Sequence, residues 1–335
     1  MTVSRFAIIA ENSWTQTGAV RTYSSGKAVT CGYDRHMAST VADRVAALLN
    51  RAVLGVAAIG GGSFGKTYRI QFFSGGAAFV KTLEHAEKVA GPGYFDAEAA
   101  GLRWLREAVG ADGASGGVRV PEVLGVAEDI LVTSWVAPGR PTPDGAEEFG
   151  RRLASLHARG AHGFGADWPG YIAVLPLDNR GDEDWATFYA ARRVLPYVRL
   201  ARDRGHLDAE GAQVIEEVCT RIDFLAGEEE RPSRIHGDAW SGNILWDGRG
   251  EGWFIDPAAH GGHRETDLAM LALFPPPYLD RIIAAYDEVH PLADGWQERV
   301  PLHQLHPLLV HAALYGSDYG VRAASVAREL AERLR

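Results

Sequence analysis

The sequence contains little cysteine, no long apolar run and no basic cluster, and each absence excludes a class of protein. Only Cys31 and Cys219 occur among 335 residues, too few for a disulfide framework, so we expect free thiols in a reducing cytoplasm. No run of about 18 apolar residues is present, which argues against a membrane span. Lysine and arginine number 34 against 43 acidic residues, and this net charge of −9 argues against nucleic acid as a partner.

The composition otherwise indicates a globular protein long enough for two domains. Hydrophobic residues make up 46% and charged residues 23% of the chain, which is ordinary for a folded protein. Residues 1–36 are polar and lack periodicity, so we interpret them as an N-terminal extension, disordered or not native to the fold, with Met37 as a candidate start. For the remainder we expect a cytoplasmic monomer.

The first part of the chain after this extension has mainly strand patterns. A helical pattern begins near Ser39, and Gly55 is its expected end. The runs "TYRIQFF" and "AAFVKT" around "SGG" predict a hairpin. A helix follows over "GYFDAEAAGLRWLREAVG", and two further strands are expected around a turn at Gly125 to Asp129.

The second part is mainly helical. The stretch "APGRPTP", Ala137 to Pro143, is the best linker candidate. Helical patterns follow, one of them interrupted by Pro196, then two short strands in "NILW" and "GWFID", and two or three final helices. This order predicts an α+β fold with a β-rich N-lobe over 37–137 and a helical C-lobe over 138–335.

A glycine-rich loop lies between the first two expected strands. Gly60 to Thr67 fits G-x-x-x-x-G-K-T, the phosphate loop of P-loop NTPases, but that motif requires a following helix. Here a strand follows, which favours a kinase-like flap whose backbone N–H groups approach phosphates; a plain hairpin turn is the alternative. The predicted nucleotide-binding residues of the flap are Gly60, Gly61, Gly62, Ser63 and Phe64.

Two charged residues after the loop fit the same hypothesis. Lys81 ends a strand pattern, where it could neutralise ATP phosphates, although an exposed edge lysine would look the same. Glu98 lies early in the next helix and could pair with Lys81, or could simply be a surface glutamate.

The strongest motif is "HGDAWSGN", which matches the H-x-D-x-x-x-x-N spacing of a kinase catalytic loop. Asp238 could accept the proton of a substrate hydroxyl, and Asn243 could offer an amide oxygen to Mg²⁺. Asp256 follows thirteen residues later, just after an apolar strand, where a carboxylate could hold the same ion. The order and spacing of all these residues predict phosphoryl transfer from ATP.

The sequence also resembles one family within this group. The runs "HGDAWSGNILWD" and "GWFIDPAAHGGHRETDLAML" look like the signature of fructosamine kinases, or ketosamine-3-kinases, relatives of aminoglycoside and choline phosphotransferases. The resemblance covers about residues 56 to 330, and it implies the bilobal, protein-kinase-like fold that this group shares. By this resemblance the 3-hydroxyl of a fructosamine or ribulosamine is phosphorylated, which leads to deglycation. The resemblance also implies that Lys81 binds phosphates, that Glu98 orients Lys81, and that Asp238 is the general base. It further implies that Asn243 and Asp256 bind the metal and that the backbone of Ser134 and Val136 contacts adenine.

Several other residues are weaker candidates. Trp240, Asp184 and Trp185 could contact the acceptor, and Trp240 could equally fill the floor of the cleft. His260 and His263 lack an evident third metal ligand, so we interpret them as polar loop residues. Three further histidines are expected along a C-terminal helical region, His303, His306 and His311. Asp267 either supports the catalytic segment or caps a helix.

Three alternatives remain open at this stage. A related kinase of aminoglycosides, choline or sugars would share the motifs but not the acceptor. A P-loop NTPase would work through Lys66, Thr67 and Asp256. A pseudokinase would bind the nucleotide without transferring phosphate.

Overall fold

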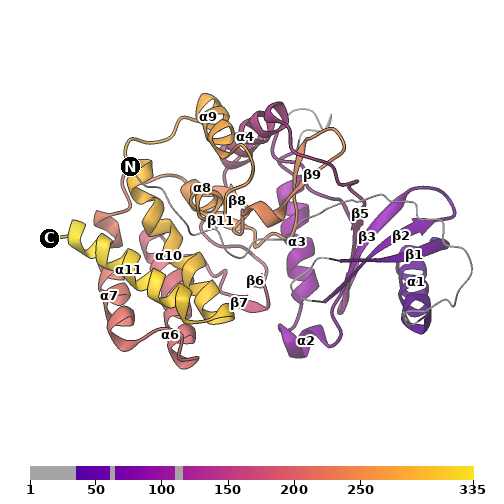
Figure 1. The fold of residues 1–335 in the computed structure, drawn as a ribbon, viewed down its shortest axis with the longest axis horizontal. Helices are drawn as coiled ribbons and strands as arrows, with labels where there is room; N and C mark the ends of the chain where they lie inside the picture. Colours follow the sequence, from indigo (N-terminus) through magenta and orange to yellow (C-terminus); the bar gives the residue numbers. More distant parts are fainter. Residues whose placement is uncertain (1–34, 61–64, 110–115) are drawn as a thin grey trace, which may run out of the picture.

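The sheet-bearing half of the protein comes first in the chain (Figure 1). The structure, a computed structural model, describes residues 35–60, 65–109 and 116–335. Five antiparallel strands form one sheet in the order β1-β2-β3-β5-β4. The elements of this half are α1 (Arg35–Leu49), β1 (Val53–Ile59), β2 (Lys66–Phe72), β3 (Ala77–Thr82), α2 (Ala86–Val89), α3 (Tyr94–Arg106), β4 (Val123–Ala127) and β5 (Ile130–Ser134).

The two faces of this sheet are covered by different helices. Val41 and Val45 of α1 pack on one face, against the strand residues that include Ile130 and Val132. The intervening Leu131 points to the other face and joins the cluster of α3. Because both faces are covered, β5 is buried along most of its length.

The helical half begins after the linker region. Its helices are α4 (Pro143–Ala158), α5 (Trp185–Phe188), a π-helix (Tyr189–Val194), α6 (Leu195–Asp203), α7 (Ala209–Cys219), α8 (Arg264–Leu273), α9 (Leu279–Val289), α10 (Trp296–Tyr315) and α11 (Ser317–Arg333). Its short strand pairs are β6 (Gly170–Ile172) with β7 (Leu175–Leu177), β9 (Ile244–Trp246) with β10 (Gly252–Phe254), and β8 (Ser233–Ile235) with β11 (His260–Gly262). No described helix has the length and apolar character that a membrane crossing requires.

Helix α3 connects the two halves. Figure 1 shows it between the sheet and the helical half, and its buried residues share one core with α4, α8 and β10. Gly101 makes this approach possible, because an added Cβ would lie 3.2 Å from the Cβ of Ala259. The site therefore forms where α3 and β3 meet the segments around β8 to β11.

Most predicted elements are present, and three details of the sheet-bearing half are wrong. The hairpin of β2 and β3 and the helix α3 are confirmed. Ser39 does not begin a helix and Gly55 does not end one, since α1 begins at Arg35 and Gly55 lies within β1. Gly125 likewise lies within β4, so only Glu128 and Asp129 separate it from β5.

The helical half differs from expectation in two places. The helical segment around Pro196 is not broken at the proline. A π-helix, Tyr189–Val194, precedes it, and Pro196 stands in the first turn of α6, where a missing N–H leaves no helical hydrogen bond unmade. Four helices rather than two or three follow β11. The predicted extension over residues 1–36 lies outside the described residues up to position 34, and Cys31 lies within that part. Cys219 is described and is a free, half-buried thiol. The division at 137/138 stays a prediction.

We predict that Gly150→Ala destabilises the contact between α4 and α9. A Cβ at Gly150 would lie 2.2 Å from the carbonyl oxygen of Ile282, so the helices must separate. We expect a loss of about 1–3 kcal/mol in the free energy of unfolding, more than the gain in helix propensity, measurable by urea denaturation. Gly55→Ala, with no atom within 4 Å of its new Cβ, is the control and should change stability little. An unchanged midpoint for Gly150→Ala would contradict this packing.

Candidate active site

One buried carboxylate, that of Asp267, holds the catalytic loop in place. Asp267, in the first turn of α8, accepts hydrogen bonds from the backbone N–H groups of His236 (2.7 Å) and Gly237 (2.9 Å). His157 of α4 lies 3.2 Å from the same carboxylate. Burial alone would raise the pKa of Asp267, but its contacts with His157 and His236 lower it. Of the two roles considered for Asp267, support of the catalytic segment agrees with these contacts.

Gly237 has a conformation that only glycine adopts easily. Its φ is +80°, and an added Cβ would lie 2.2 Å from the carbonyl oxygen of Ala258. The loop therefore turns sharply after His236, whose Nε2 lies 2.9 Å from the Ile255 carbonyl oxygen. This contact holds the segment that ends at Asp256 against the catalytic loop.

The loop brings Asp238, Asn243 and Asp256 together. The side-chain amide of Asn243 donates to the backbone oxygen and to Oδ2 of Asp238, both at 2.9 Å. The N–H of Ile255 donates to the backbone oxygen of Asn243 at 3.0 Å, which places Asp256 next along the chain from this contact. Burial raises the pKa of Asp238 to about 7; the bond from Asn243 opposes the shift, and Asp256 and Asp267 add to it.

Lys81 connects the two halves at this point. Its Nζ lies 2.8 Å from Oε1 of Glu98 on α3 and 2.6 Å from Oδ1 of Asp256. Burial alone would lower the pKa of Lys81, but the Asp256 and Glu98 carboxylates outweigh burial and raise it. Burial outweighs the ion pair at Glu98, whose pKa is raised. The ammonium of Lys81 is thus fixed toward the helical half.

Asp256 is held in a strained backbone conformation. Its φ is +56°, a left-handed value that is uncommon for residues other than glycine. Such strain persists where neighbouring contacts impose it, and it is frequent in active sites. Its carboxylate remains 42% exposed, in contrast to the buried Asp267, so a ligand could reach it.

These oxygen donors fit a magnesium ion. The amide nitrogen of Asn243 is used by Asp238, which leaves its oxygen as an acceptor, and Asp256 adds a carboxylate close by. Mg²⁺ prefers such oxygen ligands and completes its shell with water and phosphate. When bound, the ion would neutralise charge on ATP phosphates.

The residues predicted to contact the nucleotide are only partly described. Gly60 follows β1 directly, whereas Gly61, Gly62, Ser63 and Phe64 lie outside the described residues. Lys66 and Thr67 begin a strand, not a helix, and exposed Lys66 pairs with Glu84. The P-loop alternative is therefore wrong.

The two residues predicted to contact adenine lie at the end of β5 and just after it. The hydroxyl of Ser134 accepts a bond from the N–H of Glu122 at 2.9 Å, so its side chain is engaged within the lobe. Val136 is buried, at 8% exposure. Their backbone contacts with adenine stay a prediction.

The three candidates for acceptor contact lie in different surroundings. Trp240 is half-buried beside Asp238 and packs edge-on against Phe274. Asp184 caps α5 by accepting the N–H and the hydroxyl of Thr187. Trp185 is buried and stacks on Tyr189 at 4.7 Å, within the helical core. Of the three, only Trp240 lies in the catalytic loop.

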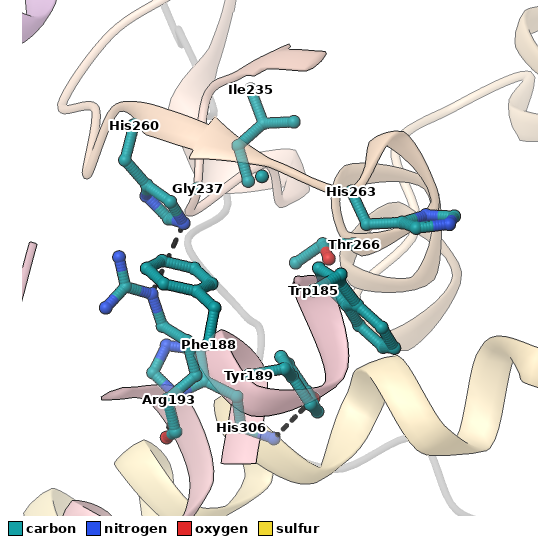
Figure 2. A pocket seen from close by; sticks show the side chains of 11 residues that line it. Trp185, Phe188, Tyr189, Arg193, Ile235, Gly237, His260, His263, Thr266 and His306 are labelled. Carbon is teal, nitrogen blue, oxygen red and sulfur yellow. Dashed lines mark hydrogen bonds between the residues drawn. The ribbon is translucent and has the colours of Figure 1, made fainter. Parts of the chain in front are cut away.

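A small enclosed cavity lies behind the loop (Figure 2). Its volume of about 10 Å³ leaves room for no more than one water molecule. Arg193, on the π-helix, lies beside it and contacts the carbonyl of Asp178, Oδ1 of Asn179 and Nε2 of His260. Burial lowers the pKa of Arg193 to about 10. No local pattern in the sequence predicts that this arginine is buried.

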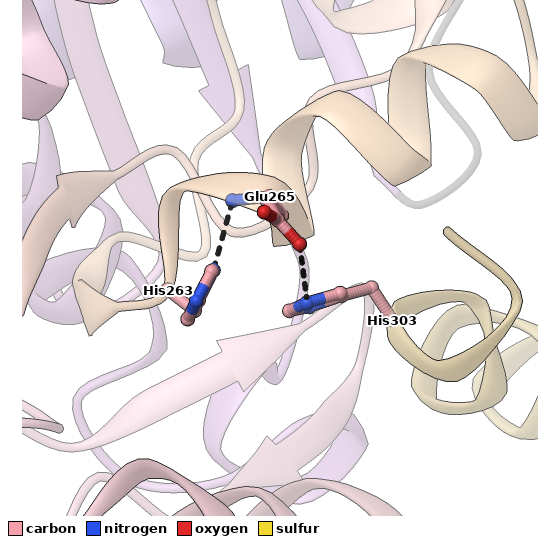
Figure 3. A group of neighbouring side chains, drawn as sticks. All are labelled: His263, Glu265 and His303. Carbon is pink, nitrogen blue, oxygen red and sulfur yellow. Dashed lines mark hydrogen bonds and ion pairs between the residues drawn. The ribbon is translucent and has the colours of Figure 1, made fainter. Parts of the chain in front are cut away.

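The prediction that His260 and His263 are polar loop residues is wrong. Each is only 4% exposed; His260 lies in β11, and the ring of His263 accepts the N–H of Glu265 as the cap of α8. The structure brings Glu265 and His303 to His263, with potential ligand atoms within 4.8 Å of one another (Figure 3). His303, His306 and His311 lie on α10, as predicted.

This cluster is better explained as a buried ion pair than as a metal site. Arg299 donates to both oxygens of Glu265, at 2.6 and 2.8 Å. Burial alone would raise the pKa of Glu265, but His303 and Arg299 outweigh it and lower the pKa to about 2. The cluster fixes the start of α8, two residues before Asp267.

Comparison with known proteins places the chain in a family. Residues 37–333 match the fructosamine kinase family. A "Probable ketoamine kinase" of Enterococcus faecium is 32% identical over 78% of this chain and 89% of that protein. The chain belongs to the fructosamine kinase family. Another relative, the chloroplastic protein-ribulosamine 3-kinase of Arabidopsis thaliana, is 30% identical over 81% of each chain.

Solved structures agree with this assignment. A candidate fructosamine-3-kinase of Thermobifida fusca is 48% identical, with a TM-score of 0.81 over 88% of this chain and 99% of that one. Choline kinase LicA of Streptococcus pneumoniae is 16% identical, with a TM-score of 0.57 over 89% and 99%. The fold of this fructosamine kinase family member is therefore the bilobal, protein-kinase-like fold predicted from its sequence.

We predict that the Glu265–Arg299 pair stabilises this family member above about pH 4.5. Glu265→Gln leaves the charge of buried Arg299 unpaired, so we expect a loss of about 3 kcal/mol at pH 7. Because the pKa of Glu265 falls from 4.5 to about 2 on folding, its contribution should disappear as the pH falls between these values.

Urea denaturation across that pH range measures the difference between wild type and variant. Glu210→Gln is the matched control, because its pair with Arg328 is exposed and should contribute less than about 1 kcal/mol. A difference that stays constant from pH 7 to pH 2 would show that the charge of Glu265 is not responsible.

Proposed function

We propose that this protein is an ATP-dependent ketosamine 3-kinase. It transfers the γ-phosphoryl group to the 3-hydroxyl of a fructosamine or ribulosamine, and later elimination of the phosphate removes the sugar from the amine. Its role would then be deglycation of amines or lysines in the cytoplasm. The observation that carries the proposal is the meeting of Lys81 with Asp256 beside Asp238.

Each group in the site has a task in phosphoryl transfer. Lys81, which Glu98 keeps extended, offsets the charge of the phosphates, and Asn243 and Asp256 would hold a Mg²⁺ that adds to this charge balance. Asp238 orients the acceptor hydroxyl and takes its proton; burial keeps the pKa of this carboxyl near neutrality, which suits a base. The backbone near Ser134 and Val136 and the loop from Gly60 to Phe64 would hold the nucleotide. Catalysis then rests on positioning and electrostatics.

The family assignment favours a ketosamine acceptor over the alternatives. Kinases of choline and aminoglycosides share the fold at 14–16% identity, whereas the named ketoamine kinases reach 32–35%. A pseudokinase would lack one of the catalytic groups, and Lys81, Asp238, Asn243 and Asp256 are all present. ATP consumption against ketosamines, aminoglycosides and amino alcohols tests the assignment, and turnover only with the last two classes would contradict it.

Asp238→Asn should lower kcat by about a hundredfold or more, because the amide cannot accept the proton. The measurement is steady-state turnover on the best ketosamine. The KM for ATP should stay near the wild-type value, since Asp238 does not hold the nucleotide. Near-normal turnover would exclude a general-base role.

Lys81→Ala should abolish turnover, whereas Lys66→Ala should leave it near the wild-type value. Lys81 lies between the carboxylates of Glu98 and Asp256, whereas exposed Lys66 pairs with exposed Glu84. Turnover and a thermal melt of both variants measure this. Loss of turnover only in Lys66→Ala would reverse the assignment of the phosphate-binding lysine.

A further inference from the structure

A continuous group of aromatic side chains extends from the catalytic loop onto the last two helices. The Trp240 ring lies 6.1 Å from that of Phe274, which stacks on His311 at 5.0 Å. His311 in turn contacts Tyr315 at 5.5 Å and Tyr319 at 5.0 Å between ring centres. We call these five residues the aromatic cluster.

The cluster is attached directly to the catalytic loop. The backbone N–H of Trp240 donates to the backbone oxygen of Asp238 at 3.1 Å. The N–H of Ser241 donates to the backbone oxygen of Phe274 at 3.1 Å. Gly242 lies so close to the Trp240 ring that an added Cβ would be 2.2 Å from it. The first ring of the cluster is thus held beside the proposed base.

The cluster is not a fully buried core. Trp240, Phe274, His311 and Tyr319 are half-buried, and Tyr315 is 56% exposed. Trp240, Phe274 and Tyr319 use part of their surface to pack on the helical core, which fixes the rings. Aromatic surface that stays accessible next to a catalytic group is typical of a binding site.

His311 contributes a defined hydrogen-bond acceptor to this surface. Its Nδ1 lies 2.8 Å from the carbonyl oxygen of Pro307, so that nitrogen carries the proton. Burial lowers the pKa of His311; the Pro307 contact opposes the shift, and Arg322 adds to it. In the neutral ring, Nε2 therefore bears a lone pair that can accept a hydrogen bond.

We propose that the aromatic cluster is the acceptor subsite and that it selects a protonated, sugar-derived amine. The ring faces attract the ammonium group of the acceptor, and Nε2 of His311 accepts a hydrogen bond from its N–H or from a sugar hydroxyl. This proposal rests on the proposed function, because a ketosamine carries such an ammonium group directly on C1 of its sugar chain. It identifies His311 and Tyr319 as residues that determine specificity.

The test compares two acceptors on wild type, His311→Ala and Tyr319→Leu. One acceptor is a fructosamine with a protonated secondary amine, and the other is its N-acetyl derivative, in which the nitrogen is neutral. We expect His311→Ala to raise the KM for the fructosamine about tenfold, with kcat and the KM for ATP within about twofold of wild type. Tyr319→Leu should reduce the preference for the charged acceptor over the neutral one by a similar factor.

His206→Gln is the matched control. His206 is also half-buried in the helical half, and its Nδ1 contacts a backbone carbonyl, that of Ala312, at 2.7 Å. If the loss of any half-buried histidine raised the KM for the fructosamine, His206→Gln would raise it too. If the KM rises because the subsite is lost, His206→Gln should leave it unchanged. Thermal melts of all variants show whether they fold, and His311→Phe, which keeps the aromatic ring but removes the acceptor nitrogen, provides a second variant at this position.

The outcomes separate the two proposals. If wild type phosphorylates the fructosamine but every variant keeps its KM and its preference between the two acceptors, the subsite is wrong and the proposed function stands. A fall in kcat with unchanged KM for both acceptors would also overturn the subsite. If wild type phosphorylates no ketosamine, both proposals fail.

Discussion

The site depends on one ammonium group that joins the two halves of the molecule. Lys81 belongs to the sheet, Glu98 to α3, and Asp256 to the helical half, yet the three charges lie within hydrogen-bonding distance. The raised pKa of Lys81 keeps it cationic, and the partial exposure of Asp256 leaves a carboxylate that a metal ion can reach. Any displacement of one half relative to the other would separate these groups, so the packing of α3 on both halves is a requirement of the chemistry.

A second constraint keeps the catalytic loop rigid. Asp267 holds the two N–H groups before Asp238, and the buried pair of Glu265 and Arg299 fixes the helix on which Asp267 stands. The left-handed backbone of Gly237 and the strained backbone of Asp256 are therefore held by contacts of groups that take no part in the reaction. The positions of the base and of the metal ligands are set before any ligand binds, which is what catalysis by positioning requires.

The sequence predicted the parts of this site that local patterns determine. Asp238 and Asn243 lie within one loop at a defined spacing, and Lys81 stands at the end of a short apolar run that follows a turn, so these residues could be found without coordinates. Features that depend on contacts between distant parts of the chain could not be found in this way. They are the burial of His260 and His263, the contact of His263 with His303, and the burial of Arg193, all of which follow from how the helices pack. The predictions of a helix end at Gly55 and of a turn beginning at Gly125 were wrong for a related reason, because pairing with neighbouring strands places both glycines inside strands.

The central claim is that these groups surround the phosphates of a bound nucleotide. A crystal structure of the protein with Mg²⁺ and AMP-PNP tests it most directly. The account predicts a metal ion bound by the side-chain oxygens of Asn243 and Asp256, the ammonium of Lys81 on the phosphates, and the γ-phosphate facing Asp238. A nucleotide bound elsewhere, or a metal ion that contacts neither Asn243 nor Asp256, would contradict it.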